Sequence, residues 1–178
     1  NARMREAAQK VAAIASGANP QVDTIFLPDG GSSLASAAQA LQTAGVNGSR
    51  VKLVGTGIWN DPQVLALPTM QGGWFAAPDS AGFAAFARRY SARYNAEPVR
   101  IASLSYDAVS LAAALVRTQG SQRFSEQVLT NPSGFAGADG VFRFLPDGTN
   151  QRALAVLEIR NGAAVTVSPA PRELKPDS

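Results

Sequence analysis

Neither cysteine nor histidine occurs in the 178 residues of this chain. Disulfide bonds require cysteine, the usual zinc sites require cysteine or histidine, and Ser-His-Asp or Cys-His catalysis requires histidine. The carboxylates are scattered singly, with no spacing that pairs two of them for acid–base catalysis. We therefore expect a protein that is not an enzyme, with no catalytic residues, no metal site and no cofactor.

Charged residues are also scarce, at 16% of the sequence, with 16 basic residues, 13 acidic residues and a net charge of +3. So small a surplus, spread along the chain, does not form the basic patch of a nucleic-acid-binding protein. No apolar run approaches the roughly 18 residues that span a bilayer. Hydrophobic residues make up 46% of the chain, which is enough for a core. The sequence thus predicts a folded domain that neither binds nucleic acid nor spans a membrane.

Helical and strand patterns alternate over the first half of the chain. The apolar positions of residues 3–16 recur at helical spacing, which predicts a helix. Short runs rich in β-forming residues predict strands at 22–27, 51–55 and 73–77. A second helix fits between the first two strands, and Asp61 caps a short helix before the third. This alternation favours an α/β fold with a mostly parallel sheet flanked by helices.

The second half of the chain has a different pattern. Asp79 or Ser80 caps a helix with a stripe of aromatic residues. Residues 101–117 then form a helix that is apolar on nearly every side, and such a helix should be buried on most sides. Two strands, at 140–144 and 154–159, flank a Pro-Asp-Gly turn and predict a C-terminal β-hairpin.

Small and hydrogen-bonding residues follow the first two predicted strands. Because ligands of open parallel sheets bind beyond the carboxyl ends of the strands, these two runs form the candidate ligand site. Glycines allow a ligand to approach the backbone closely, and hydroxyls donate hydrogen bonds. The predicted ligand-binding residues are Asp29, Gly30, Gly31, Ser32 and Ser33 after the first strand, and Thr56, Gly57 and Trp59 after the second.

Two interpretations of these residues remain open. In the first, the run from Asp29 opens a helix whose free N–H groups favour an anionic group such as a carboxylate, and Trp59 offers a flat apolar wall. In the second, Asp29 and Ser33 only cap the helix, while Trp59 only packs in the core. The sequence alone does not separate ligand binding from capping and packing.

Two other patterns are weak matches to catalytic or cofactor motifs. Ser49 and Lys52 have the S-x-x-K spacing of serine acyltransferases, but they enter a strand, where residues three apart point to opposite faces. Gly55 and Gly57 resemble the opening of a dinucleotide-binding loop, but the third glycine is missing. We interpret the first pattern as a chance match and the second as a turn.

The order of these segments resembles the second half of the type I periplasmic binding proteins, the Leu/Ile/Val-binding receptors of ABC importers and their relatives. The matching segments are VDTIFLPDGG, VKLVGTG, GGWFAAPD, FARRYSARYNAEP, SYDAVSLAAALV and GFAGADGVFRFLPDGTNQRALAVLEIRNG. Members of this family have two α/β lobes joined by three crossovers, with the ligand held in the cleft between the lobes.

The resemblance implies one partial domain of that fold over residues 1–167. Residues 1–77 and 134–162 would form the second lobe, and the helices of residues 79–130 would cross over to cover a first lobe whose sheet is not in this sequence. Residues 168–178 would be a loose tail. Without the missing sheet, the helix at 101–117 would expose a large apolar face, which the rest of a longer chain or a partner would cover.

The resemblance also implies a function. It points to an exported solute-binding protein in the periplasm, held by a lipid anchor in an N-terminal region outside this sequence. Such a protein binds a small molecule for import through an ABC permease, or for sensing. A branch of the family, the penicillin-binding-protein activators, implies an alternative partner, a cell-wall synthase, and regulation of peptidoglycan synthesis by protein–protein contact.

The residues at the strand ends bear on the ligand. Amino-acid-binding members of the family hold the ligand's ammonium group with an aromatic residue after the first strand and a carboxylate after the second. Here Gly30 or Gly31 and Gly57 occupy those places. Since glycine offers no partner for a buried charge, we expect a ligand other than a plain α-amino acid.

Overall fold

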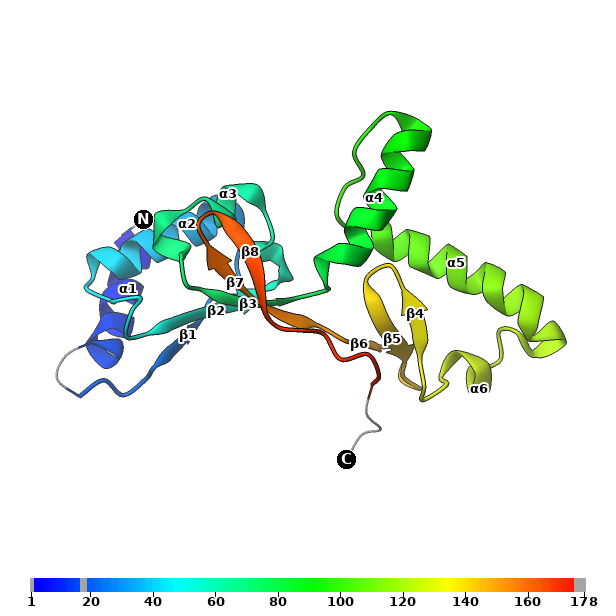
Figure 1. Cartoon of the computed structure of the whole chain (residues 1–178). Helices are drawn as coiled ribbons and strands as arrows, with labels where there is room; N and C mark the ends of the chain where they lie inside the picture. Colours follow the sequence, from blue (N-terminus) through cyan, green and yellow to red (C-terminus); the bar gives the residue numbers. More distant parts are fainter. Residues whose placement is uncertain (1, 17–18, 175–178) are drawn as a thin grey trace. The chain divides into compact units, whose positions relative to one another are not determined.

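A computed structural model describes residues 2–16 and 19–174. The chain divides into two compact units, which Figure 1 shows with their elements labelled. The first unit comprises residues 1–77 and 156–168, and the second comprises residues 78–155 and 169–178. The chain therefore passes between the units three times.

A five-stranded sheet in the order β1-β2-β3-β7-β8 forms the centre of the first unit. β1 pairs with β2 and β2 with β3 in parallel, whereas β7 and β8 are antiparallel. This arrangement confirms the predicted α/β fold with a mostly parallel sheet. The strands are β1 (Thr24–Phe26), β2 (Lys52–Thr56), β3 (Trp74–Ala77), β7 (Ala155–Arg160) and β8 (Ala163–Ser168).

Three helices and two short 3-10 turns accompany this sheet, close to the predicted positions. Asp61 caps α3 as predicted, since its carboxylate accepts a hydrogen bond from the backbone N–H of Gln63 at 2.8 Å. α1 and α2 lie side by side (Figure 1) and pack through small side chains. The elements are α1 (Ala2–Ala15), α2 (Gly31–Thr43), η1 (Gly57–Trp59), α3 (Pro62–Leu65) and η2 (Pro68–Met70).

The core of the first unit lies between α2, α3 and one face of the sheet. Along β2 the side chains alternate between buried and half-buried positions, as expected for a strand with one face on a core. The buried residues of this core are Leu34, Ala38, Leu53, Trp59, Val64, Met70, Phe75, Ala77, Leu157 and Ile159. Three of them, Trp59, Val64 and Met70, come from the segment that connects β2 to β3, so that segment is part of the core and not a surface loop.

The second unit consists of helices and a three-stranded antiparallel sheet in the order β4-β5-β6. Asp79 is the residue that caps α4, because its carboxylate accepts a hydrogen bond from the N–H of Ala81 at 2.9 Å. The elements are α4 (Ser80–Tyr94), α5 (Ala102–Thr118), η3 (Gly120–Gln122), α6 (Glu126–Leu129), β4 (Phe135–Gly137), β5 (Gly140–Phe144) and β6 (Asn150–Arg152).

The predicted pairing of 140–144 with 154–159 is wrong. The turn after β5 is so tight that Phe144 lies opposite Asn150, and the hairpin ends with β6. A C-terminal hairpin does exist, but it joins β7 to β8, and β8 ends at Ser168, the first residue of the predicted tail. Its turn is Asn161-Gly162, and both residues have positive φ, at 52° and 77°. An Asn-Gly pair between two β-rich runs is the sequence signal that identifies this hairpin.

The division of the chain also differs from the lobes that the resemblance implied. Residues 134–155 belong to the second unit, whereas they were expected with residues 1–77. The reason is a set of contacts with α5, where the Asp107 carboxylate accepts hydrogen bonds from the backbone N–H groups of Ala138 and Asp139. Residues 156–162 do lie with residues 1–77.

α5 is less buried than its composition predicted. Only Ser103, Asp107 and Leu115 of its residues are buried, while Val109 is 70% exposed. The expectation that this helix is covered on most sides is therefore wrong for the described structure, and the alternative of a large uncovered apolar face applies. No helix among the described residues is long and apolar enough to cross a membrane.

This apolar face leads to a first prediction. The 178-residue chain, purified alone, should bind a hydrophobic dye or self-associate, because exposed side chains such as Val109 and Val116 lie on one helix. Dye fluorescence and light scattering measure the two effects. Replacing Val109 and Val116 together by asparagine should reduce both signals at least about twofold, since each removes exposed apolar surface. A monodisperse monomer that binds no dye would contradict the prediction.

Candidate ligand-binding site

The two predicted runs lie together at one edge of the sheet, where the adjacent strands β1 and β2 end. The Nε1–H group of Trp59 donates hydrogen bonds to the carbonyls of Leu27 and Asp29, at 3.2 and 3.1 Å. Ile58 lies against the first run, with its Cδ1 atom 3.4 Å from the position of a Cβ on Gly30. The structure thus brings the runs beginning at Asp29 and at Thr56 next to each other.

Trp59 does not form the exposed wall that one interpretation predicted. It is 0% exposed, and its ring lies against the backbone of Gly55 and Gly73. A Cβ on Gly55 would clash with the ring, and one on Gly73 would lie 3.0 Å from it. At Gly55 only a residue without a side chain leaves room for the indole, and at Gly73 a side chain would force the ring to shift. The packing interpretation is therefore the correct one for Trp59.

Ile58 presents the apolar surface that was expected from Trp59. It is 53% exposed beside Gly30, at the carboxyl end of β2. Successive residues of the short turn η1 point in different directions, so the burial of Trp59 leaves Ile58 on the outside. Sequence reasoning missed Ile58 because the larger aromatic side chain was the stronger signal. The glycines at 55 and 73 were the clue that the indole is buried.

Asp29 and Ser33 bind each other at the start of α2. The Ser33 hydroxyl donates to Asp29 Oδ2 at 2.5 Å, and the backbone N–H of Gly30 donates to Oδ1 at 2.8 Å. These hydrogen bonds, that of Ser33 first and that of Gly30 second, lower the pKa of the Asp29 carboxyl below its usual value. The turn is thus built around an ionised, exposed carboxylate. Gly30, the N-cap residue of α2, contributes no side-chain cap.

The three glycines of the site differ in what they would tolerate. Gly31 has φ +55°, a conformation that strains any other residue. Gly30 has an extended backbone with φ −143°, and a Cβ there would make only ordinary contact with Ile58. A Cβ on Gly57 would lie 3.3 Å from the carbonyl of Ala76, which is tight. Gly30 is therefore the position at which a side chain could be added with least cost to the fold.

Two hydroxyl residues complete the edge. Ser32 is exposed in the first turn of α2, and Thr56 is half-buried at the end of β2. Thr56 precedes η1 without capping it through its side chain. Together with Ile58, they give the edge two polar groups and one apolar surface.

The S-x-x-K match has no catalytic geometry. The Ser49 hydroxyl donates to Asn47 Oδ1 at 2.8 Å, while Lys52 Nζ donates to the carbonyl of Gly72 at 2.8 Å. Each side chain therefore has its own structural partner. The described residues also contain no group of three or more acidic side chains that could hold a metal ion.

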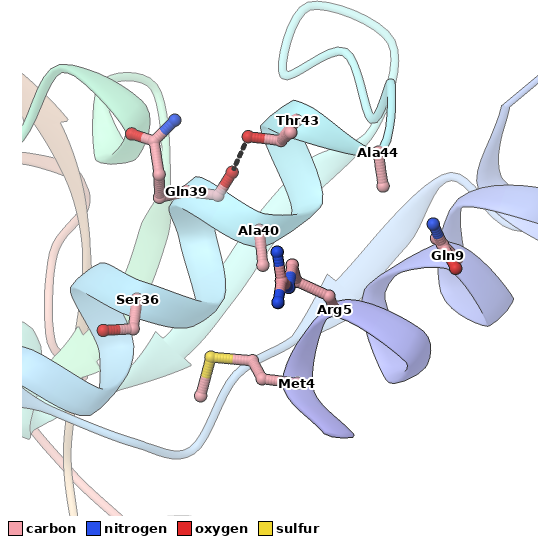
Figure 2. A pocket seen from close by; sticks show the side chains of 8 residues that line it. All are labelled: Met4, Arg5, Gln9, Ser36, Gln39, Ala40, Thr43 and Ala44. Carbon is pink, nitrogen blue, oxygen red and sulfur yellow. Dashed lines mark hydrogen bonds between the residues drawn. The ribbon is translucent and has the colours of Figure 1, made fainter. Parts of the chain in front are cut away.

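Other hollows lie away from the predicted residues. A groove of about 340 Å³ runs between α1 and α2, and Figure 2 shows Arg5 of α1 beside Ala40 of α2 in it. In the second unit, an apolar cavity of about 580 Å³ lies between α5, α6 and the turn after β5. None of the predicted ligand-binding residues lines either one.

Comparisons with known proteins agree on one family. A family model described as "Periplasmic binding protein" matches residues 7–164. No curated protein sequence matches the chain. The fold is similar to a Rhodospirillum rubrum protein assigned as a branched-chain amino acid ABC transporter, with 24% identity and a TM-score of 0.75 over 94% of this chain and 49% of that one.

Two further solved structures have a similar fold. One is an ABC transporter solute-binding protein from R. palustris in complex with benzoate, with 19% identity and a TM-score of 0.61 over 96% of this chain and 48% of that one. The other is full-length LpoA from Haemophilus influenzae, with 14% identity and a TM-score of 0.57 over 90% of this chain and 29% of that one. The chain thus spans about half the length of the first two proteins, and less of the third.

Proposed function

The chain belongs to the periplasmic binding protein family, and from this premise we propose that it forms the ligand-binding part of a solute-binding protein for ABC import or sensing. The family implies a periplasmic or extracellular location. The observation that carries the proposal is the edge where β1 and β2 end, because the small and hydrogen-bonding residues of the two runs meet there beside exposed Ile58. A permease that receives the ligand is the partner we propose.

We further propose that the ligand combines a carboxylate with an apolar body and lacks an ammonium group. Backbone N–H groups at the start of α2, together with the hydroxyls of Ser32 and Thr56, suit a carboxylate, and exposed Ile58 suits an apolar body. Gly30 and Gly57 supply no charge for an ammonium. Benzoate, which is bound to the R. palustris protein, has this combination of groups.

Asp29 is the one carboxylate among the predicted site residues, so it provides the sharpest test of this ligand class. Its two oxygens already accept hydrogen bonds from Gly30 and Ser33. In our proposal these bonds shape the turn, and Asp29 does not bind an ammonium. A ligand that did use Asp29 would need a hydrogen-bond donor there, and an ammonium group would be the strongest one.

Calorimetric titration of the purified protein with leucine and with 4-methylpentanoate, the same skeleton without the amino group, tests the proposal. We expect 4-methylpentanoate to bind at least about tenfold more tightly, a difference of about 1.4 kcal/mol. Tighter binding of leucine, lost in Asp29→Asn, would instead identify Asp29 as the ammonium partner and refute the proposed ligand class.

A second candidate function is regulation of peptidoglycan synthesis through contact with a cell-wall synthase. The similarity in fold to LpoA is consistent with it. Binding of neither probe, together with capture of a purified cell-wall synthase, would favour this candidate over solute binding.

A further inference from the structure

Two buried carboxylates lie in the second unit, away from the candidate ligand site. Asp107 is 3% exposed and Asp139 is 2% exposed. Burying an ionised carboxylate is costly unless hydrogen bonds and opposite charges compensate for the lost water. The groups that surround these two carboxylates therefore show which parts of the chain they hold together.

Asp107, on α5, binds the turn between β4 and β5. Its Oδ1 accepts a hydrogen bond from the backbone N–H of Ala138 at 2.6 Å, and its Oδ2 accepts one from the N–H of Asp139 at 3.3 Å. A Cβ on Gly137 would lie 2.6 Å from Asp107 Cγ, so the carboxylate lies directly against the backbone of the turn. These contacts attach the turn to α5.

Asp139 attaches the same turn to the start of α5. Its Oδ2 accepts hydrogen bonds from the Ser103 hydroxyl at 2.6 Å and from Arg100 Nη1 at 3.0 Å. Arg100 Nη2 also lies 3.0 Å from Asp139 Oδ1 as an ion pair. Ser103 is fully buried, whereas the Arg100 side chain is 37% exposed. The turn is therefore held by charge and by hydrogen bonds from two directions.

The same β4–β5 turn also contacts two of the connections between the units. Gly82, in the first turn of α4, packs so closely on the carbonyl of Ala138 that a Cβ would clash with it. Arg152, at the end of β6, donates to the carbonyl of Asp139 at 3.2 Å and lies 3.7 Å from Asp107 Oδ2. The chain changes units just before α4 and just after β6, at 77/78 and 155/156.

We propose that Asp107, Asp139 and the turn 137–139 form a clamp. The clamp fixes the places where the two connections enter and leave the second unit, at the start of α4 and at the end of β6. The clamp residues are positioning residues, and they act on the connections without contacting a ligand. This inference does not depend on which ligand or partner the protein has.

Hydrogen exchange of the intact protein, followed by mass spectrometry, tests the clamp. Asp107→Asn keeps the shape of the side chain but removes its charge and one acceptor. We expect the backbone amides of 138–139, 79–82 and 152–155 to exchange at least about tenfold faster, because these segments would open locally once the clamp is weakened. The strands of the first unit should keep their exchange rates. Asp147→Asn, which alters an exposed turn of the same unit, is the matched control and should leave these amides unchanged.

Two results would overturn the clamp. One is faster exchange spread evenly over both units, which indicates a general loss of stability. The other is faster exchange at 138–139 while 79–82 and 152–155 stay unchanged, which shows that the turn does not hold the connections. Should Asp107→Asn fail to fold, Ser103→Ala removes only one hydroxyl from Asp139, and the same local pattern is then required at smaller amplitude.

Discussion

Replacing Trp59 by alanine will lower the free energy of unfolding by about 3–5 kcal/mol, the range for large aromatic side chains in cores. The indole is 0% exposed and lies against Gly55 and Gly73, which have no side chains to fill the space it would leave. Its Nε1–H group also joins the ends of β1 and β2 through the carbonyls of Leu27 and Asp29. Chemical denaturation of the purified chain measures the loss.

Trp74 provides the matched control, because it is the other tryptophan of the chain, lies on β3 of the same unit and is 39% exposed. Trp74→Ala should cost about 1–2 kcal/mol, chiefly from the lost hydrogen bond to Glu158 and part of its apolar contact. Equal losses in the two variants would show that Trp59 is not the core residue described above. Gly55→Ala should resemble Trp59→Ala, since its Cβ would clash with the indole.

The second large effect concerns the candidate ligand site. Gly30→Leu should weaken binding of 4-methylpentanoate by about 100-fold or more, equivalent to about 2.7 kcal/mol, because the new side chain would occupy the edge where β1 and β2 end. The free energy of unfolding should change by less than about 1 kcal/mol, since Gly30 has an extended backbone and its Cβ would only touch Ile58. Calorimetry and chemical denaturation measure the two quantities.

Gly48→Leu is the control for this variant. Gly48 lies in a surface turn with open space around it and does not have positive φ, so the substitution adds the same side chain away from the site. Its binding affinity should equal that of the unmodified protein. If Gly30→Leu binds the probe as well as Gly48→Leu does, the ligand does not lie at the ends of β1 and β2.

Local patterns predicted the elements that depend on local interactions. The helix of residues 3–16 and the strands at 51–55 and 73–77 agree with α1, β2 and β3 to within about one or two residues. The caps at Asp61 and Asp79 were also predictable, because a carboxylate before a helix binds N–H groups only two residues away.

Features that depend on distant parts of the chain were harder to predict. Whether residues 155–160 pair with β5 or with β3 depends on contacts across about 80 residues of sequence, and no local pattern records that choice. The sequence left open whether Trp59 is exposed or packed in the core, and it did not single out Ile58. The space for the indole comes partly from Gly73, which lies at the far end of the connection between β2 and β3. At the candidate site, the order of strands and runs was enough to expect the two runs close together, but not to predict which of their side chains are exposed.

The first unit is built from two segments that are far apart in the sequence, and this affects how the chain folds. β3 pairs with β7, so the five-stranded sheet is complete only when residues 156–168 join residues 1–77. Residues 78–155 lie between them as one continuous segment, which can therefore begin to fold before residues 156–168 are available. During synthesis, the first unit must therefore wait with an open edge on β3 until the ribosome has produced β7, by which time the second unit has already had time to form.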